Sequence, residues 1–252
     1  MKLLTTTLST GVLALLPSAA SAALFTSGHA DVIAVGYVDE DTPGVFELEP
    51  HVHSEGAIID GVFVADAEFE PGEITTLVPQ STFDFWTGAG GRPAASTWDP
   101  IGVAAGESFW FLPQSNSGPG GAATLGAPFA GIGTEELTAA DWSTPITITL
   151  DSVTGPGNFS MYLDGISPFF AMSSANGIDG SDVISIAAGE HEHYNWAFTA
   201  PGIYDVGVTI AGTHVTDGPK QASATYQFQV VPEPSTALFG LISAGLLLRR
   251  RR

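Results

Sequence analysis

The sequence contains no cysteine among its 252 residues. Disulfides therefore cannot stabilise the fold, and the thiolate ligands that many zinc sites use are excluded. A transition-metal site in this chain must be built from histidine, aspartate and glutamate. The free energy of folding must come from burial of apolar side chains, and a bound metal would add to it by linkage.

Basic residues are scarce as well. Only Arg92 and Lys220 lie between residues 23 and 231, whereas 26 of the 27 acidic residues lie there, Glu233 being the exception. A nucleic-acid partner is excluded, because a phosphate backbone requires a basic face. The acidic excess favours cations, although solvation of an exposed surface explains it equally well.

The chain has no apolar run long enough for a permanent membrane span. Residues 1–22 combine a lysine, an apolar stretch and a small-x-small end, which predicts a secretory signal peptide. Near the other end, the 14 residues 235–248 would make a helix of only about 21 Å, against a bilayer core of about 30 Å. The arginines that follow would hold this end in the cytoplasm, which suits a transient transmembrane hold before processing. We predict three parts: 1–22, a folded domain at 23–231, and a sorting segment at 232–252.

Short β-rich runs separated by Gly/Pro turns fill the predicted domain, and no long segment has a helical period. Examples are 145–150, 203–210 and 222–230, the last two forming a hairpin. This pattern predicts an all-β fold, an antiparallel immunoglobulin-like or jelly-roll β-sandwich with long loops. Aromatic residues Trp196, Phe198 and Tyr204 are expected in its core.

The segment from about 82 to 143 is less regular. We expect long loops around one strand at 107–112, with a single helical turn that begins at Thr134 as its cap. The segment contains no histidine, so we assign no site residue to it.

Five of the six histidines occur at spacing i,i+2, either with another histidine or with a carboxylate: His29 with Asp31, His51 with His53, and His191 with His193. In a strand such residues point to the same face, so each pair can aim two ligands at one point. The sixth, His214, is expected at the surface.

Zinc prefers four ligands, at about 2.0–2.1 Å for imidazole nitrogen. The predicted set is His51 and His53 from one strand and His191 and His193 from another, with His29 as a replacement or fifth ligand. Asp31 is expected to accept a hydrogen bond that fixes one imidazole tautomer. Calcium would leave the histidines unused, whereas copper and nickel remain open alternatives.

Two resemblances extend this interpretation. The motif Val231-Pro232-Glu233-Pro234-Ser235, the apolar stretch and the terminal arginines resemble the PEP-CTERM sorting signal of bacterial exported proteins. That resemblance implies a membrane sorting enzyme as partner and export to the cell surface, the outer envelope or the extracellular matrix.

Segments 26–31, 50–53 and 191–204 make the domain similar to surface proteins of the choice-of-anchor M type, especially those repressed by the zinc regulator Zur. This similarity implies zinc capture at the surface, together with a zinc uptake system.

Our hypothesis from the sequence is a non-catalytic, exported zinc-binding protein. One alternative is a zinc-dependent hydrolase with an open coordination position, in which Glu55 would be the candidate base. Neither an H-E-x-x-H nor a G-x-S-x-G motif occurs. A second alternative is a structural protein of the extracellular matrix, stabilised by its metal.

Overall fold

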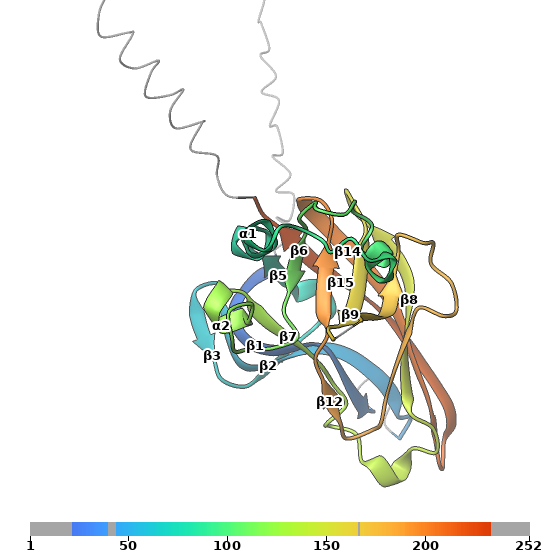
Figure 1. Cartoon of the computed structure of the whole chain (residues 1–252). Helices are drawn as coiled ribbons and strands as arrows, with labels where there is room; N and C mark the ends of the chain where they lie inside the picture. Colours follow the sequence, from blue (N-terminus) through green and yellow to red (C-terminus); the bar gives the residue numbers. More distant parts are fainter. Residues whose placement is uncertain (1–21, 40–43, 166, 233–252) are drawn as a thin grey trace, which may run out of the picture.

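The computed structural model describes residues 22–39, 44–165 and 167–232. The predicted signal peptide and sorting segment therefore lie outside the described residues, apart from Ala22 and Pro232. The described part is mostly β-strand, arranged as two sheets in a sandwich-like fold, which confirms the all-β prediction (Figure 1). In this described part, no helix is long and apolar enough to cross a membrane.

The larger sheet has the order β11-β8-β14-β15-β5-β1-β2-β3, with β4 paired to β2, β7 to β1, and β12 to β7. The bounds of its strands are β1 Ala23–Val38, β2 Glu47–Ile59, β3 Val62–Val64, β4 Ala67–Phe69, β5 Ile74–Val78, β7 Pro128–Gly133, β8 Ile146–Thr154, β11 Val183–Ile186, β12 His191–Glu192, β14 Gly202–His214 and β15 Gly218–Val230.

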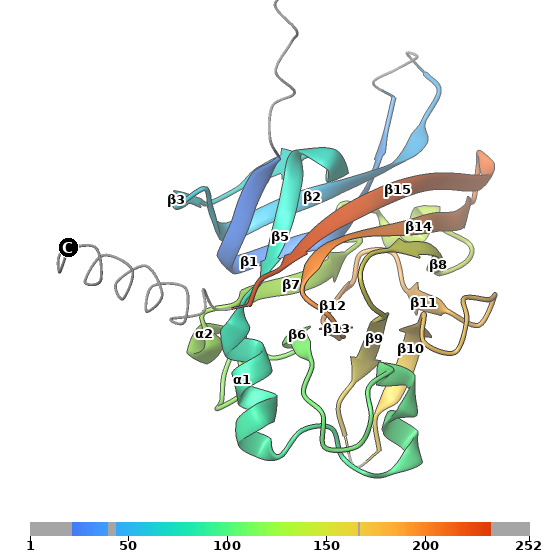
Figure 2. The same ribbon diagram turned by 90° about the horizontal axis from the view of Figure 1, so that it is seen from above.

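The smaller sheet has the order β10-β9-β13-β6 and faces the larger one (Figure 2). Its strands are β6 Trp110–Leu112, β9 Phe159–Leu163, β10 Phe169–Ser173 and β13 Asn195–Phe198. The helical elements are α1 Gln80–Ala89, α2 Ala122–Leu125 and three short 3-10 turns at Pro71–Glu73, Ser96–Ile101 and Ala139–Asp141.

Most strand pairs are antiparallel, as predicted, including the full-length hairpin of β14 and β15. Three pairs are parallel: β1 with β5, β1 with β7, and β5 with β15. Parallel neighbours need a long crossover connection. The alternation of residues within a strand does not reveal whether its neighbour runs parallel or antiparallel. The larger sheet is therefore mixed.

The core lies between the sheets and is rich in aromatic rings. Trp196, Phe198 and Tyr204 are at most 1% exposed, which confirms their predicted core position. Phe228 on β15 packs against Trp196 and Phe198 across the interface, with ring centroids 5.5 and 5.1 Å apart. The Tyr204 hydroxyl donates to the Ala200 carbonyl at 2.9 Å and accepts from its amide at 3.1 Å, which fixes the turn before β14.

The segment predicted as loops contains more structure than its sequence suggested. It includes α1, α2 and β7, while the strand expected at 107–112 is reduced to β6. The helical turn expected at Thr134 is wrong. The Thr134 hydroxyl donates to the carbonyls of Ala187 and Glu190 instead of capping a helix, and the Leu137 amide closes a tight turn onto the Thr134 carbonyl at 2.9 Å.

Candidate metal centre

Strand β7 lies between β1, which carries His29, and β12, which carries His191. It runs parallel to β1, where His29 is level with Phe129 and Asp31 with Gly131. On its other edge it pairs antiparallel with β12, where His191 is level with Gly133. Side chains from β1 and β12 therefore meet over β7, although they are far apart in the sequence.

The sequence places His191 and His193 in one strand, whereas the structure divides this segment between two strands in two sheets. Strand β12 ends at Glu192 in the larger sheet, and β13 begins at Asn195 in the smaller one. His193 lies in the connection and still turns toward His191. Glu192, between the two histidines, accepts a hydrogen bond from the Tyr194 hydroxyl at 3.0 Å.

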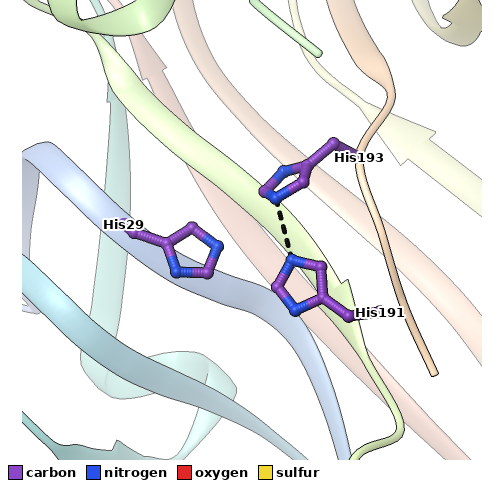
Figure 3. A group of neighbouring side chains, drawn as sticks. All are labelled: His29, His191 and His193. Atoms are coloured by element: carbon purple, nitrogen blue, oxygen red, sulfur yellow. Dashed lines mark hydrogen bonds between the residues drawn. The ribbon is translucent and has the colours of Figure 1, made fainter. Parts of the chain in front are cut away.

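His29, His191 and His193 form a tri-histidine cluster, in which the three rings lie close together (Figure 3). Their ring centroids are 5.1, 5.2 and 4.6 Å apart. The Nε2 atoms of His191 and His193 are separated by 2.8 Å. Two imidazole nitrogens bound to one tetrahedral zinc are about 3.3 Å apart, given bonds of about 2.0–2.1 Å. A shift of about half an ångström would therefore let both bind one ion.

Each ring of the cluster is held through its Nδ1 atom by an oxygen. His29 Nδ1 lies 2.9 Å from Glu55 Oε2, and His191 Nδ1 lies 3.2 Å from Glu135 Oε2. His193 Nδ1 lies 2.9 Å from the carbonyl oxygen of Ala130, which can only accept. Nδ1 donates to such acceptors, so a neutral ring carries its lone pair on Nε2. Imidazoles that bind metals are commonly oriented in this way through their other nitrogen.

Asp31 is buried beside these rings, with 2% of its surface exposed. Its Oδ2 lies 3.4 Å from His191 Nδ1, in keeping with the predicted role of an acceptor behind an imidazole. Its Oδ1 lies 3.7 Å from His29 Nε2, and both of these buried atoms have no hydrogen-bond partner. Buried polar atoms are rarely left unsatisfied, and a cation between these two would satisfy both.

Two glycines of β7 make the space for this carboxylate. A Cβ atom on Gly133 would overlap Asp31 Oδ2, and one on Gly131 would overlap Asp31 Oδ1 and lie 3.0 Å from His191 Nε2. The Asp31 carboxylate therefore occupies the space that side chains at positions 131 and 133 would otherwise fill. This arrangement lets an aspartate on β1 reach across β7 to a histidine on β12.

The electrostatics of the cluster suit a cation. Burial, reinforced by the nearby His191, lowers the pKa of His29 to about 4. Burial also lowers the pKa of His193 to about 4, although its hydrogen bond to Ala130 opposes the shift. Burial raises the pKa of Asp31 to about 7, while His191 acts in the opposite direction. At neutral pH the two imidazoles are uncharged, as ligation requires, and a bound cation would favour the ionised carboxylate.

The single ligand shell predicted from the sequence does not form. His51 and His53 lie on β2, on the opposite side of β1 from β7 and β12. Across residues 22–39, 44–165 and 167–232, no group of ligand atoms within 4.8 Å of one another joins this pair to His191 and His193. His51 and His53 instead group with Glu136. The ligand role of the five histidines stays a prediction, now divided between two places.

His214, predicted at the surface, is partly buried. Its side chain is only 12% exposed, because it packs against Tyr37 and Trp142 and lies 3.1 Å from Asp217.

Sequence reasoning missed Gly131, Gly133, Glu135 and Glu136, all within the segment to which no site residue was assigned. The sequence signal for these residues was a pair of glycines at spacing i,i+2 in a β-rich run, followed by two adjacent carboxylates. Their use depends on the pairing of β7 with β1 and β12, which the sequence does not reveal.

The chain was also compared with known proteins. It matches no protein-family model, no curated protein and no solved structure.

Proposed function

We propose that this protein is an exported, surface-associated zinc-binding protein that captures or buffers zinc without catalysing a reaction. The tri-histidine cluster, with Asp31, would hold the ion. One observation carries the proposal: three imidazoles are each held through Nδ1 by an oxygen, and two of their Nε2 atoms are 2.8 Å apart while the third has no partner.

The ligand chemistry supports zinc over the hard cations. Three imidazole nitrogens and one carboxylate oxygen are ligands that four-coordinate zinc accepts. Calcium takes six to eight oxygen ligands, and magnesium demands octahedral oxygen. Copper and nickel also bind imidazole, so their affinities belong in the same titration.

The surroundings of Glu55 and Asp31 favour holding an ion over using it. Glu55, the candidate base of the hydrolase alternative, contacts His29 Nδ1 at 2.9 Å and thereby orients that ring. Asp31 Oδ1 lies 3.7 Å from His29 Nε2, close to the ligand spacing of about 3.3 Å expected in a tetrahedral zinc site. Ligand atoms that lie within 4.8 Å of one another group Asp31 with His29, Glu55 and His191, whereas His193 belongs to the tri-histidine cluster. Asp31 would therefore have to shift toward His193 to fill the position that a catalytic water requires.

Sequence features support the cellular part of the proposal. The predicted signal peptide and PEP-CTERM segment favour export and contact with a membrane sorting enzyme. The resemblance to Zur-repressed surface proteins favours expression of this protein when zinc is limiting. It also favours a zinc uptake system as the partner that receives the zinc. The acidic excess of the domain would raise the local cation concentration.

Zinc titration of the purified protein tests the proposal. We expect one tightly bound ion, removed by the double substitution His191→Ala and His193→Ala and retained in the control His214→Ala. Cobalt in the same place should give a four-coordinate absorption spectrum without an exchangeable water. Zinc binding that is unaffected by the double substitution in a folded protein would overturn the assignment.

A further inference from the structure

A second cluster of ligands lies on the other side of β1. It consists of His51 and His53 on β2 and Glu136 in the turn after β7, and we call it the His51 cluster. Glu136 Oε1 lies 2.9 Å from His51 Nε2 and 3.4 Å from His53 Nδ1. One carboxylate oxygen therefore faces a nitrogen of each ring.

The outer nitrogen of each ring is again held by an oxygen. His51 Nδ1 lies 3.2 Å from the carbonyl oxygen of Glu49, which can only accept. His53 Nε2 lies 2.9 Å from Asp66 Oδ1. A neutral imidazole has one proton, and these contacts place it on the outer nitrogen. Two lone pairs and a carboxylate oxygen then converge. Protonation of the rings or one divalent ion would stabilise this arrangement.

The backbone leaves room for this group. Gly36 on β1 has no side chain where His51 and Glu136 approach, and a Cβ atom there would lie 3.1 Å from Glu136 Oε2 and 3.7 Å from His51 Cε1. The burial is graded, because the side chain of His51 is 4% exposed whereas that of Glu136 is 35% exposed. The cluster has a fixed inner ligand and a side open to solvent.

We propose that the His51 cluster is a second divalent-cation site, separate from the tri-histidine cluster, so that one chain binds two ions. The ligand set of two imidazoles and one carboxylate suits Zn²⁺, Fe²⁺ or Co²⁺ and leaves coordination positions for water. An ion held by three protein ligands at an open face exchanges faster than one enclosed by four. The inference does not depend on the proposed zinc centre, because it uses other residues.

A single turn connects the two sites. Glu135 contacts His191 in the tri-histidine cluster, and Glu136, the next residue, contacts His51 and His53. The tight turn from Thr134 to Leu137 therefore sends consecutive carboxylates to different sites. This gives a matched pair of isosteric substitutions, Glu135→Gln and Glu136→Gln, which differ by one position in the chain.

Native mass spectrometry and calorimetry during titration with Zn²⁺, repeated with Co²⁺, test the inference on the purified protein. We expect two equivalents in the unmodified chain, the second weaker than the first. Glu136→Gln should weaken the second equivalent at least 10-fold and leave the first unchanged. Glu135→Gln should weaken the first by about 10- to 100-fold, the usual effect of losing a carboxylate behind a histidine ligand, and leave the second unchanged.

Each result separates this inference from the proposed function. A single equivalent that Glu136→Gln does not affect would show that the His51 cluster is only a set of ion pairs, and would overturn the inference. Zinc bound only at the His51 cluster would support the inference and overturn the zinc centre proposed above. If Glu136→Gln does not fold, His53→Ala gives the same discrimination, because its side chain is partly exposed.

Discussion

The substitution Gly133→Ala adds one Cβ atom beside Asp31 and tests the role of that carboxylate in zinc binding. The added Cβ would overlap Asp31 Oδ2, and its three nearest neighbours all belong to Asp31. The side chain of Asp31 must then move off β7, away from the position in which it faces His29 and His191. No histidine of the cluster is altered.

The expected loss of zinc affinity follows from the role of Asp31. Loss of the acceptor that Asp31 Oδ2 offers to His191 Nδ1 would by itself cost about 10- to 100-fold in affinity, which is about 1.4–2.8 kcal/mol, and loss of the proposed ligand oxygen Oδ1 would add to it. Gly133→Ala should therefore lose at least this much affinity, with the stoichiometry at the His51 cluster unchanged. Competition with a chromophoric chelator measures the affinity, and circular dichroism establishes that the variant is folded.

A double-mutant cycle with Asp31→Ala provides the decisive comparison. If Gly133→Ala acts by displacing the carboxylate, it should cost almost nothing once the carboxylate has been removed, so the two losses should not add. Additive losses would refute the reasoning, since the alanine would then act through the backbone of β7. Gly180→Ala is the matched control, because a Cβ atom at Gly180 meets nothing within 4 Å.

Three further outcomes are expected. Equilibrium dialysis between pH 8 and about pH 5 should show the tri-histidine cluster keeping its ion to a lower pH than the His51 cluster, because burial holds the pKa of His29 and His193 near 4 and these two rings stay uncharged over that range. The His51 cluster should release its ion first as the pH falls, because burial lowers the pKa of His51 but the hydrogen bond to Glu136 raises it above its usual value, so protons compete for that ring sooner; simultaneous release from both clusters would contradict this. Zinc at 100 times its Kd should raise the melting temperature by about 5–10 °C in scanning calorimetry, since it stabilises the folded state by about 2.7 kcal/mol; an unchanged melting temperature would mean that zinc does not favour the folded chain. Tyr204→Phe removes the hydroxyl that bonds Ala200 and should cost about 1 kcal/mol in a denaturant melt without changing zinc stoichiometry; lost zinc would tie that turn to the centre.

The fold class could be predicted because it depends on local patterns. Alternation and Gly/Pro turns identify strands such as β14 and β15, and their short connection identifies the hairpin. Core aromatics such as Trp196 could be predicted for the same reason. The parallel partners of β1 could not, because residues within a strand are spaced alike whichever neighbour they acquire.

The histidine motifs could be found in the sequence, but not their division into two clusters. Spacing i,i+2 correctly brings His51 beside His53 and His191 beside His193. It says nothing about which side of β1 each pair occupies. That choice is made by β7, whose glycines accommodate Asp31 and whose following turn supplies Glu135 and Glu136.

The placement of β7 between β1 and β12 also determines when the centre can exist. His29 and His191 are 162 positions apart in the sequence, and they meet only after β7 has paired with both of its neighbours. Closure of so long a loop comes late in folding, since its entropy must be offset by contacts already made. A chain still being synthesised would carry scattered histidines and no assembled centre. The metal composition of the compartment where folding is completed would therefore determine which ion the protein first encounters.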